Sequence, residues 1–114
     1  MIYWPQTDTD FVTRIPNAAG YVPSEGDPAL WIEVRNNVGH LAVSGGVSDY
    51  DVTPLYIEAT VGNTAQMPEG EYTYTLKLGA GGMVISNGLL IVGDYQADRE
   101  QYETSVNYEQ YGQN

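Results

Sequence analysis

Turn-forming residues interrupt this 114-residue chain at short, regular intervals. Through residues 1–90, Gly, Pro, Asn or Asp recurs about every eight to twelve positions, and no segment there has a helical hydrophobic period. Short strands joined by tight turns produce this spacing in β-sandwiches and β-barrels. The chain is therefore predicted to be all-β. Antiparallel pairing through its short loops predicts a small β-sandwich of about seven strands.

Alternation of apolar and polar residues marks the strands that should be buried on one face. In three segments the residues expected to face the core are Leu30, Ile32 and Val34; Leu55, Ile57, Ala59 and Val61; and Tyr72, Tyr74, Leu76 and Leu78. Residues 36–37 predict a tight turn, and residues 40–44 predict a return strand, with the glycines at 45–46 closing it. Residues 83–92 are almost all apolar, which predicts a strand buried on both faces with Asn87–Gly88 as a bulge or break.

The composition changes after Gly93. Residues 94–114 contain five acidic residues, one Arg and four Tyr, and Val106 is their only aliphatic side chain larger than Ala. Alone, such a segment buries too little apolar area to offset its ordering entropy. We therefore divide the chain into a β-sandwich domain, residues 1–93, and a Tyr-rich acidic docking tail, residues 94–114. The tail residues predicted to bind a partner are Tyr95, Tyr102, Tyr108 and Tyr111.

The charge of the chain excludes several partners. Fifteen acidic residues against four Lys and Arg give a net charge of −11, which repels nucleic-acid phosphates and anionic lipid head groups. No apolar run approaches the roughly 20 residues of a membrane span, and Met1–Pro5 has no secretory-signal pattern. The absence of Cys excludes disulfides, thiolate metal centres and thiol catalysis.

The residues that could carry chemistry do not form a recognised catalytic motif. His40 has no local partner at a known spacing, and no Ser lies in a Gly-x-Ser-x-Gly elbow. We therefore expect no enzyme activity, no cofactor, and no assigned catalytic or metal-binding residue. The pairs Asp8/Asp10 and Asp49/Asp51 are more typical of solubilising turns, and calcium binding by either pair stays open.

The segment Met67-Pro-Glu-Gly-Glu-Tyr72 carries a structural resemblance. Tyr72 follows a loop-closing Gly by two residues at the start of a predicted strand. This resembles the tyrosine corner of immunoglobulin-like and fibronectin-like sandwiches, in which the phenol bonds to nearby backbone. The resemblance implies that residues 1–93 form an immunoglobulin-like β-sandwich domain and that residues 71–78 and 83–92 are its last two strands, a hairpin.

A longer resemblance covers residues 55–111. The segments Leu55-Tyr-Ile-Glu, Gly70-Glu-Tyr-Thr-Tyr-Thr-Leu, Gly88-Leu-Leu-Ile-Val-Gly-Asp-Tyr95 and Tyr108-Glu-Gln-Tyr111 resemble small proteins of tailed phages and prophages of gut Bacteroidales, the crAss-like phages among them. The resemblance implies a virion structural protein, an auxiliary capsid, collar or tail component. Its partners would be other virion proteins, with self-association as a further option. No functional residue is transferred.

Two other classes stay open at this stage. The chain could be a carbohydrate- or surface-binding module in which exposed aromatics such as Trp4, Tyr21 and Trp31 stack on sugar rings. Coplanar, exposed aromatics would favour that alternative. A small hydrolase would instead need His40 beside two carboxylates in a cleft.

Overall fold

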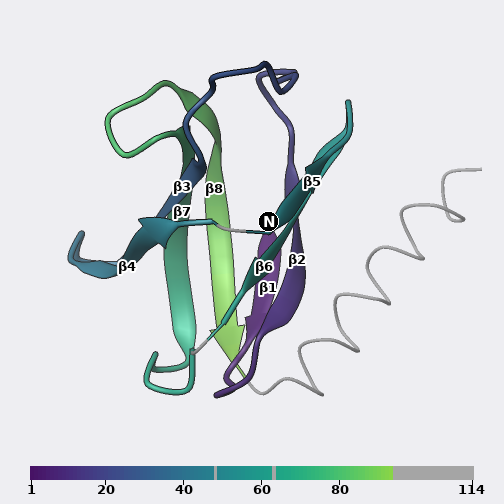
Figure 1. Ribbon diagram of the computed structural model, residues 1–114. Helices are drawn as coiled ribbons and strands as arrows, with labels where there is room; N and C mark the ends of the chain where they lie inside the picture. Colours follow the sequence, from purple (N-terminus) through teal and green to yellow (C-terminus); the bar gives the residue numbers. More distant parts are fainter. Residues whose placement is uncertain (48, 63, 94–114) are drawn as a thin grey trace, which may run out of the picture.

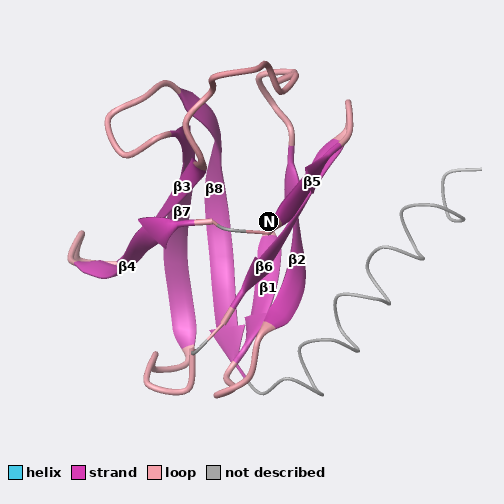
Figure 2. Ribbon diagram, in the orientation of Figure 1, coloured by secondary structure: helices cyan, strands magenta, loops and turns pink. Residues whose placement is uncertain are grey.

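The described part of the chain consists of strands and loops. A computed structural model describes residues 1–47, 49–62 and 64–93. These residues form eight strands in two sheets and contain no helix (Figures 1 and 2), which confirms the all-β prediction. The docking tail, with Tyr95, Tyr102, Tyr108 and Tyr111, lies outside the described residues.

The larger sheet has five strands in the order β1-β8-β7-β3-β4. They are β1 (Ile2–Pro5), β3 (Leu30–Asn36), β4 (Leu41–Gly46), β7 (Gly70–Leu78) and β8 (Val84–Gly93). All neighbours pair antiparallel except β1, which runs parallel to β8. The expectation of antiparallel pairing throughout is wrong for this pair. Only directly connected hairpin strands are forced to be antiparallel, and almost the whole domain separates β1 from β8.

The smaller sheet has three antiparallel strands in the order β2-β6-β5. They are β2 (Phe11–Pro16), β5 (Tyr50–Val52) and β6 (Tyr56–Val61). The two sheets lie face to face, and the chain crosses between them four times, through the loops that join β1 to β2, β2 to β3, β4 to β5 and β6 to β7 (Figure 1). The result is a two-layered sandwich with the core between the layers.

The core is built from the inner faces of both sheets, as the alternation predicts for β3 and β7. Leu30, Ile32 and Val34 of β3 are buried, as are Tyr72, Tyr74 and Leu76 of β7, while Leu78 is partly buried. Trp4 from β1 is only 1% exposed and meets Phe11 edge to face, with ring centroids 5.7 Å apart. Its indole Nε1 donates a hydrogen bond to Thr13 Oγ1 at 3.0 Å, so its polar atom is satisfied inside the core.

The predicted inward position of Leu55 is wrong. Leu55 is 80% exposed, whereas Ile57 and Ala59 are buried and Val61 is partly buried. The alternating strand β6 begins at Tyr56, one residue after Leu55, because a hydrogen-bonded turn precedes it. The Thr53 N–H donates to the Tyr56 carbonyl at 2.9 Å, and Thr53 Oγ1 accepts from the Tyr56 N–H at 3.1 Å. Leu55 therefore lies in the turn between β5 and β6.

Strand β8 is also not buried on both faces. Val84 and Leu89 are exposed because the described residues do not cover the outer face of the larger sheet. The bulge lies at Ile85 and not at Asn87–Gly88: Leu76 is opposite Ser86 and Lys77 is opposite Val84. The extra residue lets Ile85 and Ser86 both face the core, although they are neighbours in the chain.

The bond expected of a tyrosine corner is present at the start of β7. The Tyr72 phenol donates to the Pro68 carbonyl at 2.6 Å, and its ring is buried. We expect Tyr72→Phe to lower the free energy of unfolding by about 1 kcal/mol, the usual contribution of one hydrogen bond. Urea denaturation measures the change.

Tyr56→Phe is the matched control for this substitution. The Tyr56 hydroxyl has no hydrogen-bond partner among the described residues, and its ring faces the Arg14 guanidinium at 4.6 Å. Its removal should leave the unfolding midpoint nearly unchanged. Equal midpoints for the two variants would show that the Tyr72 bond adds no stability.

Candidate functional site

Within the described part of the chain, the backbone of β4 is unpaired along one side. This strand ends the larger sheet, and among the described strands it pairs only with β3. The Val47 N–H donates to the Leu30 carbonyl at 2.7 Å. Because such bonds alternate along an antiparallel pair, Ser44 and Gly46 direct their amides and carbonyls away from β3. No strand of the described chain takes up these groups, so the β4 edge can accept another strand.

Along residues 43–46, the β4 edge carries none of the common features that block strand addition. Edge strands are often protected by charged residues, Pro or bulges. β4 has the sequence Leu-Ala-Val-Ser-Gly-Gly, with no charge and no Pro. Its one register shift lies at its start, between the pairs Val34–Val43 and Arg35–Leu41. Residues 43–46 therefore offer a regular, uncharged backbone.

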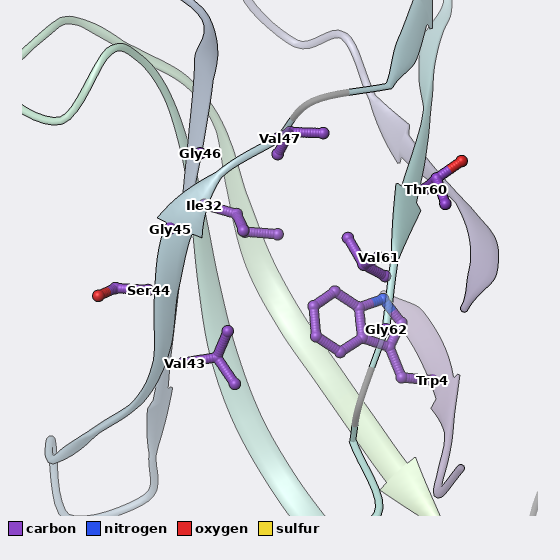
Figure 3. Close-up of a pocket in the computed structure, with 10 residues that line it drawn as sticks. All are labelled: Trp4, Ile32, Val43, Ser44, Gly45, Gly46, Val47, Thr60, Val61 and Gly62. Carbon is purple, nitrogen blue, oxygen red and sulfur yellow. The ribbon is translucent and has the colours of Figure 1, made fainter. Parts of the chain in front are cut away.

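A cleft of about 210 Å³ opens next to this edge, where the two sheets separate (Figure 3). Ile32 and residues 43–47 line it on the side of the larger sheet, and residues 60–62 line the opposite side. Figure 3 shows Ile32 and Val43 directed across the opening toward Trp4 and Val61. No acidic or basic side chain lines the cleft. It can hold an apolar side chain but supplies no general acid or base.

The outer face beside β4 is close to neutral, although the whole chain has a net charge of −11. Glu33, opposite Ser44 in the register, pairs with Lys77 Nζ at 3.2 Å. Arg35 Nη1 donates to the Gly39 carbonyl at 3.2 Å. The other acidic residues of the described part lie in the inter-sheet loops, on the smaller sheet or at the start of β7: Asp8, Asp10, Glu25, Asp27, Asp49, Asp51, Glu58, Glu69 and Glu71.

Trp31 lies on the same outer face. Gly46 lies beside the indole, since a Cβ at that position would be in ordinary van der Waals contact with Trp31 Cε3 at 4.0 Å. The ring is partly buried, and its Nε1 is buried without a hydrogen-bond partner in the described part of the chain. Trp31 is therefore an apolar surface next to the β4 edge.

The residues considered for catalysis or metal binding are not assembled into a site. His40 is exposed in the turn between β3 and β4, where its main-chain N–H donates to Asn36 Oδ1 at 2.9 Å. Asp8 and Asp10 are exposed between β1 and β2, and Asp49 and Asp51 are exposed at β5. Across residues 1–47, 49–62 and 64–93, no three His, Asp or Glu side chains gather as a metal site requires.

The aromatic residues suggested for sugar stacking do not form one surface. Trp4 is buried, so its predicted exposure is wrong: β1 pairs with β8 in a register that turns Ile2 and Trp4 toward the core. Tyr21 lies in the loop between β2 and β3, and its phenol donates to Asp27 Oδ2 at 2.8 Å. Of these three residues, only Trp31 lies on an open sheet face. One ring does not form the set of coplanar, exposed aromatics that sugar stacking would favour.

The interaction between Tyr21 and Asp27 predicts a pH effect. Burial raises the pKa of Tyr21 to about 12, assisted by the hydrogen bond to Asp27 and the charge of that carboxylate. The folded state holds the phenol proton more tightly than the unfolded state, whose pKa is near 10. This contribution to stability should be complete below pH 10 and be lost as the pH rises toward about 12.

Ultraviolet absorbance of the phenolate measures this titration, with Tyr21→Phe identifying the late-titrating group. Asp27→Asn removes the charge and should lower the pKa of Tyr21. Wild-type and D27N titration curves that coincide would contradict the role of Asp27.

The β4 edge is the feature that the sequence analysis missed. The predicted return strand ended before residues 45–46, whereas β4 includes both glycines. A sequence signal was present, because no Asp, Glu, Lys or Arg occurs between Arg35 and Asp49. The position of β4 at the end of a sheet depends on pairing between distant segments and has no local signal.

Comparison with known proteins assigns no family to the chain. No family model matches it, and neither the curated proteins nor the solved structures include a significant match. The described residues contain no helix with the length and apolar character needed to cross a membrane. The function must therefore be inferred from the geometry of the β4 edge and from the sequence.

Proposed function

We propose that this chain is a non-enzymatic structural protein that attaches to neighbouring protein subunits in a tailed-phage particle. The observation that carries the proposal is the uncharged edge of β4, which no other described strand pairs with, beside an apolar cleft. The tailed-phage setting, as an auxiliary capsid, collar or tail component, rests on the resemblance of residues 55–111. Residues 94–114 would add a second attachment through Tyr95, Tyr102, Tyr108 and Tyr111.

Strand addition explains how such an edge could bind. An extended segment of a partner would exchange main-chain hydrogen bonds with Ser44 and Gly46, which supply affinity for any strand. The cleft beside Val43 and Val61 would accept an apolar side chain of that segment and supply selectivity. Neither step needs a titratable group, so the arrangement favours binding over catalysis.

The strand arrangement supports an immunoglobulin-like sandwich as the scaffold. That fold separates strands B, E and D from strands C, F and G. Here β2, β6 and β5 form one sheet, while β3, β7 and β8 lie together in the other. The bond from Tyr72 to Pro68 at the start of β7 matches the place of a tyrosine corner. The chain differs from antibody domains in having no disulfide and in placing Trp31 of β3 on the outer face.

Detection of the chain in purified phage particles tests the proposed function. Particles of the phage that encodes it would be isolated by density gradient and probed with an antibody against this chain. We expect the wild-type chain to migrate with the particles. A chain found only in the soluble fraction would contradict the proposal.

Two variants then locate the attachment surface. Truncation after Gly93 should leave a folded domain, because the described core lies within residues 1–93, but should abolish incorporation. Ser44→Glu should reduce incorporation, whereas Thr73→Glu adds the same charge to an exposed position of the central strand β7 and should not. Wild-type incorporation of the truncated chain would exclude a docking role for residues 94–114.

A further inference from the structure

We propose that the occupant of the β4 edge is a second copy of this chain, so that two larger sheets join into one continuous sheet across a two-fold axis. This inference rests on the proposed function, because it takes the β4 edge to be a docking surface and names its partner. Three features of the described residues support a second copy: the charge around β4, the register that β4 can form with itself, and the side chains beside it.

The charge distribution favours like molecules meeting at this edge. Two chains that each carry −11 repel one another, so a contact between copies needs a surface without uncompensated acidic groups. β4 has no charged residue, and the nearest carboxylate in the register, Glu33, is paired with Lys77 at 3.2 Å. Arg35 adds a positive charge to the same face. Two acidic chains can therefore meet along β4 without bringing uncompensated carboxylates of this strand or of its register neighbours together.

The register of β4 is self-complementary. An axis at Gly45 would pair Ser44 of each copy with Gly46 of the other, and these two residues are the ones whose amides and carbonyls point away from β3. A two-fold axis uses each interaction twice, which is the usual construction of a homodimer. This pairing does not involve the irregular start of the strand near Leu41.

The side chains next to that register are compatible with close approach. Ser44, Gly45 and Gly46 are small, so no bulky group separates the two backbones. On the inner face, Val43 of one copy would lie opposite Val47 of the other, beside the cleft that both residues line. On the outer face, Trp31 lies against Gly46 and would extend the apolar contact. The dimer would thus bury apolar surface as well as main-chain groups.

Sedimentation of the full chain at several protein concentrations and salt concentrations tests the inference. We expect a reversible monomer–dimer equilibrium whose dissociation constant falls by about tenfold as NaCl rises from low concentration to about 0.5 M, since salt screens the repulsion between the two chains. A dissociation constant that instead rises with NaCl would indicate attraction between opposite charges at the contact and would contradict this account of the dimer. Occupation of the edge by residues 94–114 of the same chain would give a monomer at every protein concentration and would overturn the inference.

Substitutions at Ser44 test whether the dimer uses the β4 edge. Ser44→Pro removes an N–H that points away from β3, so it should leave the sheet intact and weaken dimerisation by about a hundredfold. Ser44→Ala retains the N–H and should dimerise as the wild type does. Circular dichroism confirms folding of each variant. If Ser44→Pro does not fold, Ser44→Glu replaces it, with Thr73→Glu as the control for added charge.

The outcomes separate this inference from the proposed function. A monomer at all concentrations and salt levels, or a dimer unaffected by folded S44P and S44E variants, overturns the second-copy inference. If the chain is a monomer but S44E still prevents incorporation into particles, the β4 edge binds a different subunit and the proposed function stands. If dimerisation depends on Ser44 but the chain is absent from particles, the inference stands and the phage function fails.

Discussion

Replacement of Trp4 by alanine is expected to lower the free energy of unfolding by about 3–5 kcal/mol. The indole is 1% exposed, packs against Phe11 and donates a hydrogen bond to Thr13. Alanine would leave a large cavity between the sheets and remove the donor that satisfies the Thr13 hydroxyl. Because domains of this size are stable by only about 5–15 kcal/mol, this loss would remove a large fraction of the total.

Urea denaturation followed by circular dichroism measures the effect, and the second tryptophan provides the matched control. Trp31→Ala removes the same side chain from the open outer face and should cost much less, because the indole there is only partly buried. If Trp4→Ala does not fold, Trp4→Phe should fold with an intermediate loss. Equal costs for Trp4→Ala and Trp31→Ala would contradict the core position of Trp4.

Replacement of Asn17 by alanine is expected to lower the free energy of unfolding by about 3 kcal/mol, the sum of three lost hydrogen bonds at about 1 kcal/mol each. The buried Asn17 side chain donates from Nδ2 to the carbonyls of Tyr21 and Thr53, both at 2.9 Å. Its Oδ1 accepts from the Tyr21 N–H at 2.8 Å. One amide therefore connects the loop between β2 and β3 to the turn that precedes β6.

Thermal and urea denaturation measure the Asn17 effect, with Asn87→Ala as the control. Asn87 is exposed on β8, and its side chain makes no hydrogen bond within the described part of the chain, so its replacement should change stability by only a few tenths of a kcal/mol. Limited proteolysis should cut the loop of residues 17–29 in the Asn17 variant and not in the wild type. A loop that stays resistant would show that other contacts hold it.

The strands with clear alternation could be predicted from local sequence. In β3 and β7, each inward residue is apolar or aromatic and most outward residues are polar, so one assignment of faces is strongly favoured. The hairpin joining β7 to β8 was predictable because the glycine-rich residues 79–82 follow a regular alternating strand. In the structure Gly79 adopts a φ of 81° in this turn. The Tyr72 bond followed from its spacing to the loop that precedes β7.

The errors in β8 share one cause, which is that burial depends on distant partners. The apolar run of β8 suggested cover on both sides, but Val84 and Leu89 lie on a face that the described residues leave open. The bulge at Ile85 contacts the loop between β2 and β3, which is distant in sequence: the Ile85 carbonyl accepts a hydrogen bond from the Ala19 N–H at 3.1 Å. Neither fact could be read from residues 83–92 alone.

By itself, the amino-acid sequence determined the all-β character of this protein, the inward faces of its most regular strands and the acidity that limits its partners. These properties depend on residues a few positions apart, where period-two alternation and turn chemistry act directly. Only the tertiary structure decided that β1 lies parallel to β8, that Trp4 enters the core and that β4 ends the sheet. Each of these results from the way that segments far apart in the chain pair, and the proposed site exists because no other strand of residues 1–47, 49–62 and 64–93 pairs with the outer edge of β4.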